Sequence, residues 1–177
     1  MPANGRSKAD FEIVVLQHLD SAYTLARWLM RNSPQDAEDA VQDACIRALQ
    51  AYAGFSGTSP RGWLLAIVRN VCLTRLRNRP RAVPLDDAMT QVDRVAALAD
   101  EERRPDRQLV ARNEQARVAA AIARLPDALR EIIVLREIEE LSYQDIADTV
   151  GVPIGTVMSR LSRGRERLKT MLSGDEG

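Results

Sequence analysis

Residues 141–168, LSYQDIADTVGVPIGTVMSRLSRGRERL, predict two helices joined by a tight turn. Ser142, followed three residues later by Asp145, matches the pattern of a capped helix N-terminus. Gly151 stands where a helix commonly ends in the left-handed conformation, and Pro153 suits the first turn of the next helix. Val157, Leu161 and Leu168 would form the apolar stripe of that second helix. The stretch therefore predicts a helix-turn-helix.

Charges are ordered along this stretch, with acids before the turn and basic residues after it. The acids before the turn are Glu137, Glu139, Glu140, Asp145 and Asp148. From Pro153 to Lys169 the only acid is Glu166, against four arginines and Lys169. A helix that faces DNA phosphates needs such a local excess of positive charge. The alternative is a solvated helical hairpin, because any amphipathic helix pair has a charged outer face.

The net charge of the whole chain is zero and conceals this segregation. No acidic residue occurs in 44–85, which contains seven arginines, whereas an acidic block at 36–43 comes just before it. Charges that are separated along a chain rather than mixed indicate distinct interaction surfaces. We therefore expect two kinds of partner, one of them DNA.

Composition favours helix over sheet, because Ala, Leu, Arg and Glu are abundant and aromatic residues are few. No apolar run is long enough to span a membrane, and the N-terminus lacks the apolar core of a signal peptide. We therefore expect a cytoplasmic protein without direct membrane insertion. Cys45 and Cys72 are isolated and are interpreted as small buried hydrophobes.

Helical periodicity divides the chain into two modules around a connector rich in proline and acids. Helices are expected at 11–30, 35–52, 61–78, 109–123 and 127–135, ahead of the helix-turn-helix. A loop at 54–60 carries one large apolar residue, Phe55. The expected organisation is a disordered tail at 1–10, a domain at 11–80, a linker at 81–105 with a short helical piece at 92–99, and a domain at 106–173. The fold class is all-α, with two small helical domains.

Three motifs in this order resemble the extracytoplasmic-function branch (group IV) of the bacterial sigma-70 family. DAEDAVQDACIRAL at 36–49 is similar to region 2.2, and WLLAIVRNVCLTRLRNR at 63–79 to regions 2.3 and 2.4. The third motif, at 125–168, is similar to region 4 and includes the helix-turn-helix. The resemblance covers nearly the whole chain. It implies a three-helix region 2 and a four-helix region 4, which is the minimal two-domain arrangement of this family.

The acidic helix is implied to bind core RNA polymerase. DNA phosphates would repel it, and in the family this helix docks on the clamp coiled coil of the β′ subunit. Asp39, Gln42 and Asp43 match the positions that face this partner, and the polymerase β subunit is a further expected contact. Taken alone, the acids are better explained as compensation of the helix dipole.

The loop and the arginine helix behind it are implied to recognise and melt the −10 element. In the family, the loop captures a flipped base and the helix follows the strand; stacking and nearby cations offset the cost of flipping. The residues expected to contact the −10 element are Phe55, Arg69, Asn70, Arg75, Arg77 and Arg79. Trp63 is better explained by core packing, whereas Phe55 is equally compatible with packing and with base stacking.

The second helix of the helix-turn-helix is implied to read the −35 element in the major groove. The residues expected on its DNA face are Thr156, Met158, Ser159, Arg160, Ser162 and Arg163. Many relatives carry arginine where Met158 stands, and methionine cannot make a bidentate contact to guanine. The −35 specificity is therefore expected to differ, and no consensus is assigned.

The implied function is a dissociable, non-catalytic initiation subunit that brings core polymerase to a subset of promoters. The main alternative is a helix-turn-helix regulator that does not bind polymerase; the acidic helix argues against it. A nucleic-acid-modifying enzyme is a third hypothesis, but His18 has no ligand partner at helical spacing and no nucleophile–base cluster occurs. No cofactor or metal is expected. The resemblance leaves open whether an anti-sigma factor binds between the two domains.

Overall fold

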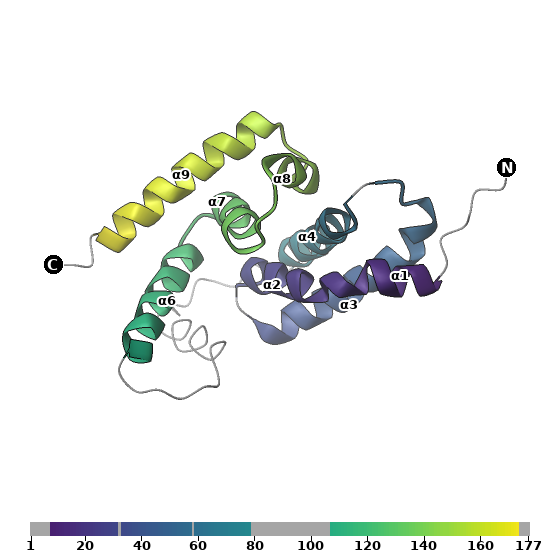
Figure 1. The fold of residues 1–177 in the computed structure, drawn as a ribbon, viewed down its shortest axis with the longest axis horizontal. Coiled ribbons are helices and arrows are strands. Elements are labelled where there is room, and N and C mark those ends of the chain that lie inside the picture. The colour runs from purple at the N-terminus through teal and green to yellow at the C-terminus, as the bar shows by residue number, and fades with distance from the viewer. Residues whose placement is uncertain (1–7, 32, 58, 79–106, 174–177) are drawn as a thin grey trace.

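The computed structural model describes residues 8–31, 33–57, 59–78 and 107–173, and every element in them is helical (Figure 1). The N-terminal elements are α1 (Lys8–Val14), the short 3₁₀ turn η1 (Leu16–His18), α2 (Leu19–Leu29), α3 (Pro34–Ala51), the turn η2 (Tyr52–Gly54) and α4 (Pro60–Asn78). The C-terminal elements are α6 (Arg107–Ala123), α7 (Asp127–Ile133), the π-helical turn η3 (Val134–Ile138), α8 (Tyr143–Val150) and α9 (Ile154–Ser173). The expected disordered tail, apart from its last three residues, lies outside the described residues, as does the expected linker with its helical piece at 92–99.

The N-terminal bundle, α1–α4, is built around the small face of α3. Four alanines at helical spacing on this helix, Ala37, Ala40, Ala44 and Ala48, are fully buried. Small side chains allow α2 and α4 to approach α3 closely, and Leu25, Leu64 and Val68 fill the space between them.

The single helix expected at 11–30 is a wrong prediction, because η1 separates α1 from α2. Three consecutive β-branched residues, Ile13, Val14 and Val15, precede the break. Their restricted side-chain rotamers lower helix propensity, so continuing the helix here gains little. Ser33 is the N-cap of α3 as expected, but its side chain makes no capping hydrogen bond.

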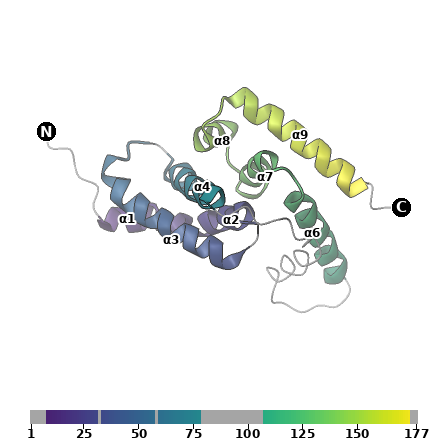
Figure 2. The same cartoon turned by 180° about the vertical axis from the view of Figure 1, so that it is seen from behind.

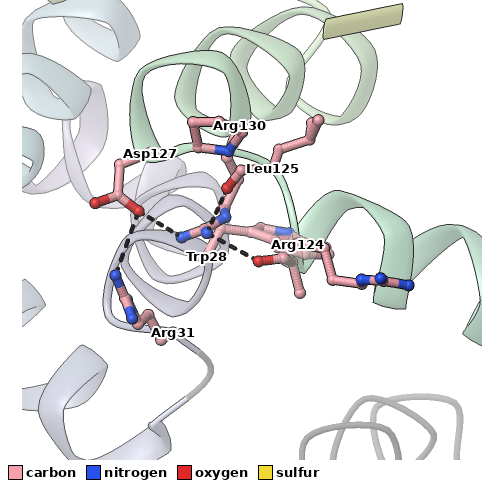
Figure 3. Close-up of a pocket in the computed structure, with 8 residues that line it drawn as sticks. Trp28, Arg31, Arg124, Leu125, Asp127 and Arg130 are labelled. Atoms are coloured by element: carbon pink, nitrogen blue, oxygen red, sulfur yellow. Dashed lines mark hydrogen bonds and ion pairs between the residues drawn. The ribbon is translucent and has the colours of Figure 1, made fainter. Parts of the chain in front are cut away.

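The C-terminal bundle, α6–α9, is held by a buried arginine where α6 meets α7. Arg130 of α7 donates to the carbonyls of Ala123 (2.8 Å) and Leu125 (2.7 Å) at the end of α6, and to Asp127 (3.1 Å). These bonds satisfy carbonyls that a helix C-terminus leaves without partners. Figure 3 shows this arrangement beside a cavity of about 510 Å³ that Trp28 and Arg31 of α2 also line.

The helix-turn-helix has the local geometry that its sequence predicted. Ser142 Oγ accepts from the Asp145 amide at 3.0 Å, and its hydroxyl donates to the Asp145 carboxylate at 2.6 Å. Gly151 has φ 72°, the left-handed conformation that glycine adopts without steric cost. α8 therefore ends at Val150, and the chain turns directly into α9.

The two bundles pack directly against each other. α4 lies beside α8, and α2 lies beside α7 and η3 (Figures 1 and 2). α9 lies on the far side of the C-terminal bundle, away from α4, in both views. The helix-turn-helix therefore has its first helix at the interface between the bundles and its second helix at the outside.

Close packing of α9 on α7 depends on Gly164, and Gly155 in the same helix offers a control. A Cβ at Gly164 would lie 2.9 Å from Ile133 Cγ1, whereas nothing lies within 4 Å of one at Gly155. We expect Gly164→Val to lower the free energy of unfolding by roughly 1–3 kcal/mol through overpacking. Gly155→Ala should leave it unchanged or raise it by up to about 1 kcal/mol. Urea denaturation followed by circular dichroism measures both; equal effects would contradict the assigned packing.

Candidate nucleic-acid interface

α9 presents an exposed polar face opposite a buried one. Val157, Leu161 and Gly164 are buried against the rest of the C-terminal bundle. Among the expected −35 residues, Met158, Ser159, Ser162 and Arg163 are exposed, and Thr156 and Arg160 are half-buried. Met158 is the most apolar of them and exposes 55% of its surface. The helix thus carries hydroxyl, thioether and guanidinium groups on a solvent-facing surface, which suits contact with phosphates and base edges.

The acidic face of α3 is accessible, but it is not isolated from the arginine helix. Asp39 and Gln42 are exposed, and the side chains of Asp39 and Asp43 expose 58% and 44% of their surface. Arg75 of α4 donates to the Asp43 carboxylate (3.2 Å) and to the Asp39 carbonyl (3.2 Å). The hydrogen bond that Arg75 donates to Asp43 raises the pKa of Arg75. Arg75, expected at the −10 element, therefore also braces the surface expected to bind polymerase.

The arginine helix α4 directs its expected −10 residues in different directions. Asn70 and Arg77, two turns apart, are exposed on one face. Arg75 points to α3, as described above, and Arg69 points to the C-terminal bundle. Arg79 lies outside the described residues. Only Asn70 and Arg77 are thus presented together to solvent in this conformation.

Two arginines of α4 form ion pairs with buried carboxylates of the C-terminal bundle. Arg69 binds both oxygens of Glu131 in α7, with the second contact at 3.3 Å. Arg61 binds Glu139, at the end of η3, and also donates to Ser21 Oγ at 3.1 Å. The side chains of Glu131 and Glu139 expose only 5% and 6% of their surface. Buried carboxylates require such partners, since an unpaired charge in this environment is strongly unfavourable.

The loop between α3 and α4 holds Phe55 in an aromatic cluster rather than free in solvent. The Phe55 ring is half-buried, with its centroid 4.7 Å from that of Trp63 and 6.4 Å from that of Tyr52. Gly57 lies under this ring, and a Cβ there would come within 2.7 Å of it. A cavity of about 420 Å³ adjoins the loop, and Asp145, Asp148 and Thr149 of α8 line its other side.

Sequence reasoning missed the contacts between the bundles. The sequence places Arg61 in a basic segment and Glu139 in the acidic run before the turn, and it gives no signal for a role of Glu131 or Thr149. The segregation of charge was the available signal, because an acidic segment and a basic segment of one chain can neutralise each other. Glu131 is nevertheless separated from Arg69 by a long stretch of sequence, and only the fold brings them together.

Within the described residues, no cluster of His, Cys, Asp and Glu side chains could hold a metal ion. No helix in this part of the chain has the length and apolarity needed to cross a membrane. Burial raises the pKa of the Cys72 thiol to about 12, as expected for a structural cysteine.

Comparison with known proteins assigns both bundles to one family. Residues 14–82 match the family description "Sigma-70 region 2", and residues 115–168 match "Sigma-70, region 4". The RNA polymerase sigma-H factor of Pseudomonas aeruginosa is 34% identical over 170 residues, which cover 93% of this chain and 87% of that protein. The chain belongs to the sigma-70 family, in its extracytoplasmic-function branch.

Other relatives support the same branch. The ECF RNA polymerase sigma factor SigE of Mycolicibacterium smegmatis is 36% identical over 160 residues, covering 90% of this chain but only 60% of that longer protein. SigW of Bacillus subtilis is 30% identical, and the match covers 92% of this chain and 88% of that protein. The N-terminal bundle is accordingly called region 2 below, and the C-terminal bundle region 4.

Solved structures resemble the whole two-bundle arrangement. The sigma factor RpoE of Bartonella quintana, solved in complex with the anti-sigma factor NepR, superposes with a TM-score of 0.67 at 28% identity, covering 94% of this chain and 99% of that one. CnrH, solved in complex with the cytosolic domain of CnrY, superposes with a TM-score of 0.64 at 26% identity, covering 96% of this chain and 92% of that one.

Arg75 pairs more closely with Asp43 than with Asp39, so substitutions of these two acids should have different effects. Asp39→Lys changes a largely exposed carboxylate, whose contact with Arg75 Nη1 is longer, at 3.8 Å, than that of Asp43. This variant should weaken binding to core polymerase while the chain stays folded. Asp43→Lys would place a cation against Arg75, so it should also lower the melting temperature of the chain. Pull-down with core polymerase and thermal denaturation measure the two effects. Unchanged polymerase binding by folded Asp39→Lys protein would exclude this face as the docking surface.

Proposed function

We propose that this chain is a non-catalytic, cytoplasmic initiation factor that binds core RNA polymerase and directs it to a subset of promoters. The observation that carries the proposal is the presence of both sigma-70 regions in one chain, with an exposed acidic face on region 2 and an exposed basic helix on region 4. A regulator that acts on DNA alone would have no use for the acidic face.

Three surfaces divide the work in this proposal. Asp39, Gln42 and Asp43 bind the β′ clamp coiled coil. The loop around Phe55, together with α4, contacts and opens the −10 element. The outer face of α9 reads the −35 element in the major groove, and Met158 makes apolar contact there in place of a guanine contact.

An anti-sigma factor is a further proposed partner. RpoE was solved in complex with the anti-sigma factor NepR. CnrH was solved in complex with the cytosolic domain of CnrY. The similarity spans both regions of this chain, so a regulator that contacts both regions is the form we propose.

Run-off transcription with purified core polymerase tests the proposed function directly. The chain should convert core enzyme, which initiates poorly from duplex promoters, into one that starts at defined sites on genomic fragments. A chain that binds DNA but leaves core polymerase unchanged would support the alternative of a regulator independent of polymerase.

Arg163 and Arg165 form a matched pair for testing −35 recognition. Both are exposed on α9, but Arg165 is paired with Glu137 at 2.7 Å. Arg163→Ala should reduce discrimination among −35 sequences. If it also removes a phosphate contact, the slope of the logarithm of the binding constant against the logarithm of salt concentration should become shallower by roughly 0.9. Arg165→Ala should have a smaller effect on both quantities, measured by fluorescence anisotropy. An equal loss for all sequences would make Arg163 a phosphate anchor only.

Asn70 offers the cleanest test of promoter opening, since it is exposed and Phe55 is partly structural. Asn70→Ala, alone or with Phe55→Ala, should leave closed-complex formation near wild type and reduce permanganate reactivity of thymines in the −10 region. A pre-melted template should partly restore transcription, because the cost of unstacking is then already met. Asn113→Ala, an exposed position in α6, serves as the control. Equal transcription defects on duplex and pre-melted templates would contradict the proposed role of Asn70 and Phe55 in opening the −10 element.

A further inference from the structure

The first two turns of α9 expose a mostly apolar set of side chains. Within residues 154–160, the exposed positions are Ile154, Gly155, Met158 and Ser159. Ile154 and Met158 expose 44% and 55% of their surface, and they are two of the seven large apolar residues that the described part of the chain exposes. Because they are four residues apart, they lie on one face of the helix. The start of α9 therefore presents an apolar strip to solvent.

The other exposed positions in these two turns offer little for hydrogen bonding. Gly155 has no side chain, and nothing lies within 4 Å of a Cβ placed there. The Ser159 hydroxyl donates to the Thr156 carbonyl at 3.1 Å, so its hydrogen points back to the helix. Ile154 and Met158 are thus the longest exposed side chains at this end of α9, and a partner can approach the backbone closely at Gly155.

The surroundings of the strip favour DNA over protein as its occupant. Farther along α9, Ser162, Arg163 and Arg167 are exposed, and no acid occurs in 153–165. α9 lies on the outside of the molecule in both Figure 1 and Figure 2. In a helix-turn-helix, the N-terminal residues of the second helix contact base edges, while cations and hydroxyls contact phosphates. The apolar strip occupies the part of α9 where base edges are expected.

Thymine is the base that presents an apolar group in the major groove. Its C5-methyl group lies there, whereas the other bases are distinguished by hydrogen-bond donors and acceptors. Ile154 and Met158 have no donor, so contact with methyl groups is the readout that their chemistry allows. Residues four apart rise about 6 Å along a helix, and base pairs stack about 3.4 Å apart. Two methyl groups that these residues reach therefore lie within two base-pair steps.

We propose that Ile154 and Met158 read the C5-methyl groups of two thymines in the −35 element, on either strand and within two base-pair steps of each other. This inference rests on the proposed role of α9 at that element, and it names the chemical group that the start of the helix recognises. The stiff, β-branched Ile154 fixes one point of contact, whereas the flexible Met158 thioether adapts to the second. Arg163 supplies hydrogen-bond readout farther along the same helix.

Removing single methyl groups from the DNA tests the proposal without altering the protein. Holoenzyme assembled from the full chain and core polymerase first selects its preferred sequences from duplex promoters randomised at the −35 element. Each thymine of the selected site is then replaced by deoxyuridine, which lacks the methyl group and keeps the same pairing. Replacement of either contacted thymine should weaken binding roughly fourfold, which corresponds to about 0.8 kcal/mol for one buried carbon group. Competition measured by fluorescence anisotropy, at a temperature that keeps the duplex closed, gives the affinities.

Alanine variants assign each methyl group to its side chain. Met158→Ala should abolish the difference between thymine and deoxyuridine at one position, and Ile154→Ala should abolish it at the other. Each variant should keep the difference that belongs to the other residue. Both side chains are exposed, so the melting temperature of the chain should stay near wild type. Val118→Ala, which shortens an exposed apolar side chain of α6, is the control and should keep both differences.

Adding a methyl group gives the reverse test. A contacted thymine is replaced by cytosine or by 5-methylcytosine, each paired with guanine. The wild-type chain should bind the methylated site more tightly, because the methyl group is returned to the groove, and the matching alanine variant should not distinguish the two. Met158→Arg should shift the preference at its position from thymine toward guanine, since a guanidinium group pairs with guanine through two hydrogen bonds.

The outcomes separate failure of this inference from failure of the proposed function. The methyl reading is wrong if the selected site lacks two such thymines, or if deoxyuridine has no effect or the same effect on the wild type and both alanine variants. Sequence discrimination that still depends on Arg163 would then keep the proposed −35 role. A selection that enriches no −35 sequence would overturn that role itself. If Ile154→Ala or Met158→Ala weakens core-polymerase binding in the absence of DNA, the strip is a protein-docking surface and the proposal is overturned.

Discussion

Two buried carboxylates, Glu131 and Glu139, determine how the two halves of this molecule fit together. A charged carboxylate removed from water needs a cation and hydrogen bonds close by, or burial costs several kcal/mol. α7 and η3 therefore pack where arginines are presented, and α4 presents Arg69 and Arg61 at the matching spacing. The position of α8 on α4, the closure of the cavity beside Phe55 and the outward orientation of α9 all follow from this docking.

Such an interface is well suited to opening. Inter-domain contacts built on ion pairs depend on geometry and ionic surroundings more than purely apolar ones, and relative domain motion is the usual expectation. The two regions also have separate cores, with the alanine face of α3 in one and Val157 and Leu161 in the other. Each region can thus keep its own fold if the contact between them opens.

Sequence reasoning succeeded where a local rule decides the structure. Gly151 predicted the end of α8, and Ser142 with Asp145 predicted its start, because turn and capping geometry involve neighbouring residues. It failed for the helix expected at 11–30, where three β-branched residues outweighed an otherwise regular apolar periodicity. The environment of Arg75 was also beyond prediction, since its partners Asp43 and Asp39 lie on a different helix.

By itself, the sequence determined the all-α class, the helix-turn-helix and the membership in a family of initiation factors, because helix periodicity, turn residues and motif order are properties of contiguous residues. Only the tertiary structure decided which charged groups are presented to a partner and which are engaged within the chain. Arginines at 69, 75 and 77 look equivalent in the sequence, yet one meets Glu131, one meets Asp43 and one is exposed. The physical reason is that charge pairing depends on distance in space, and the fold alone sets which helix faces lie within reach of one another.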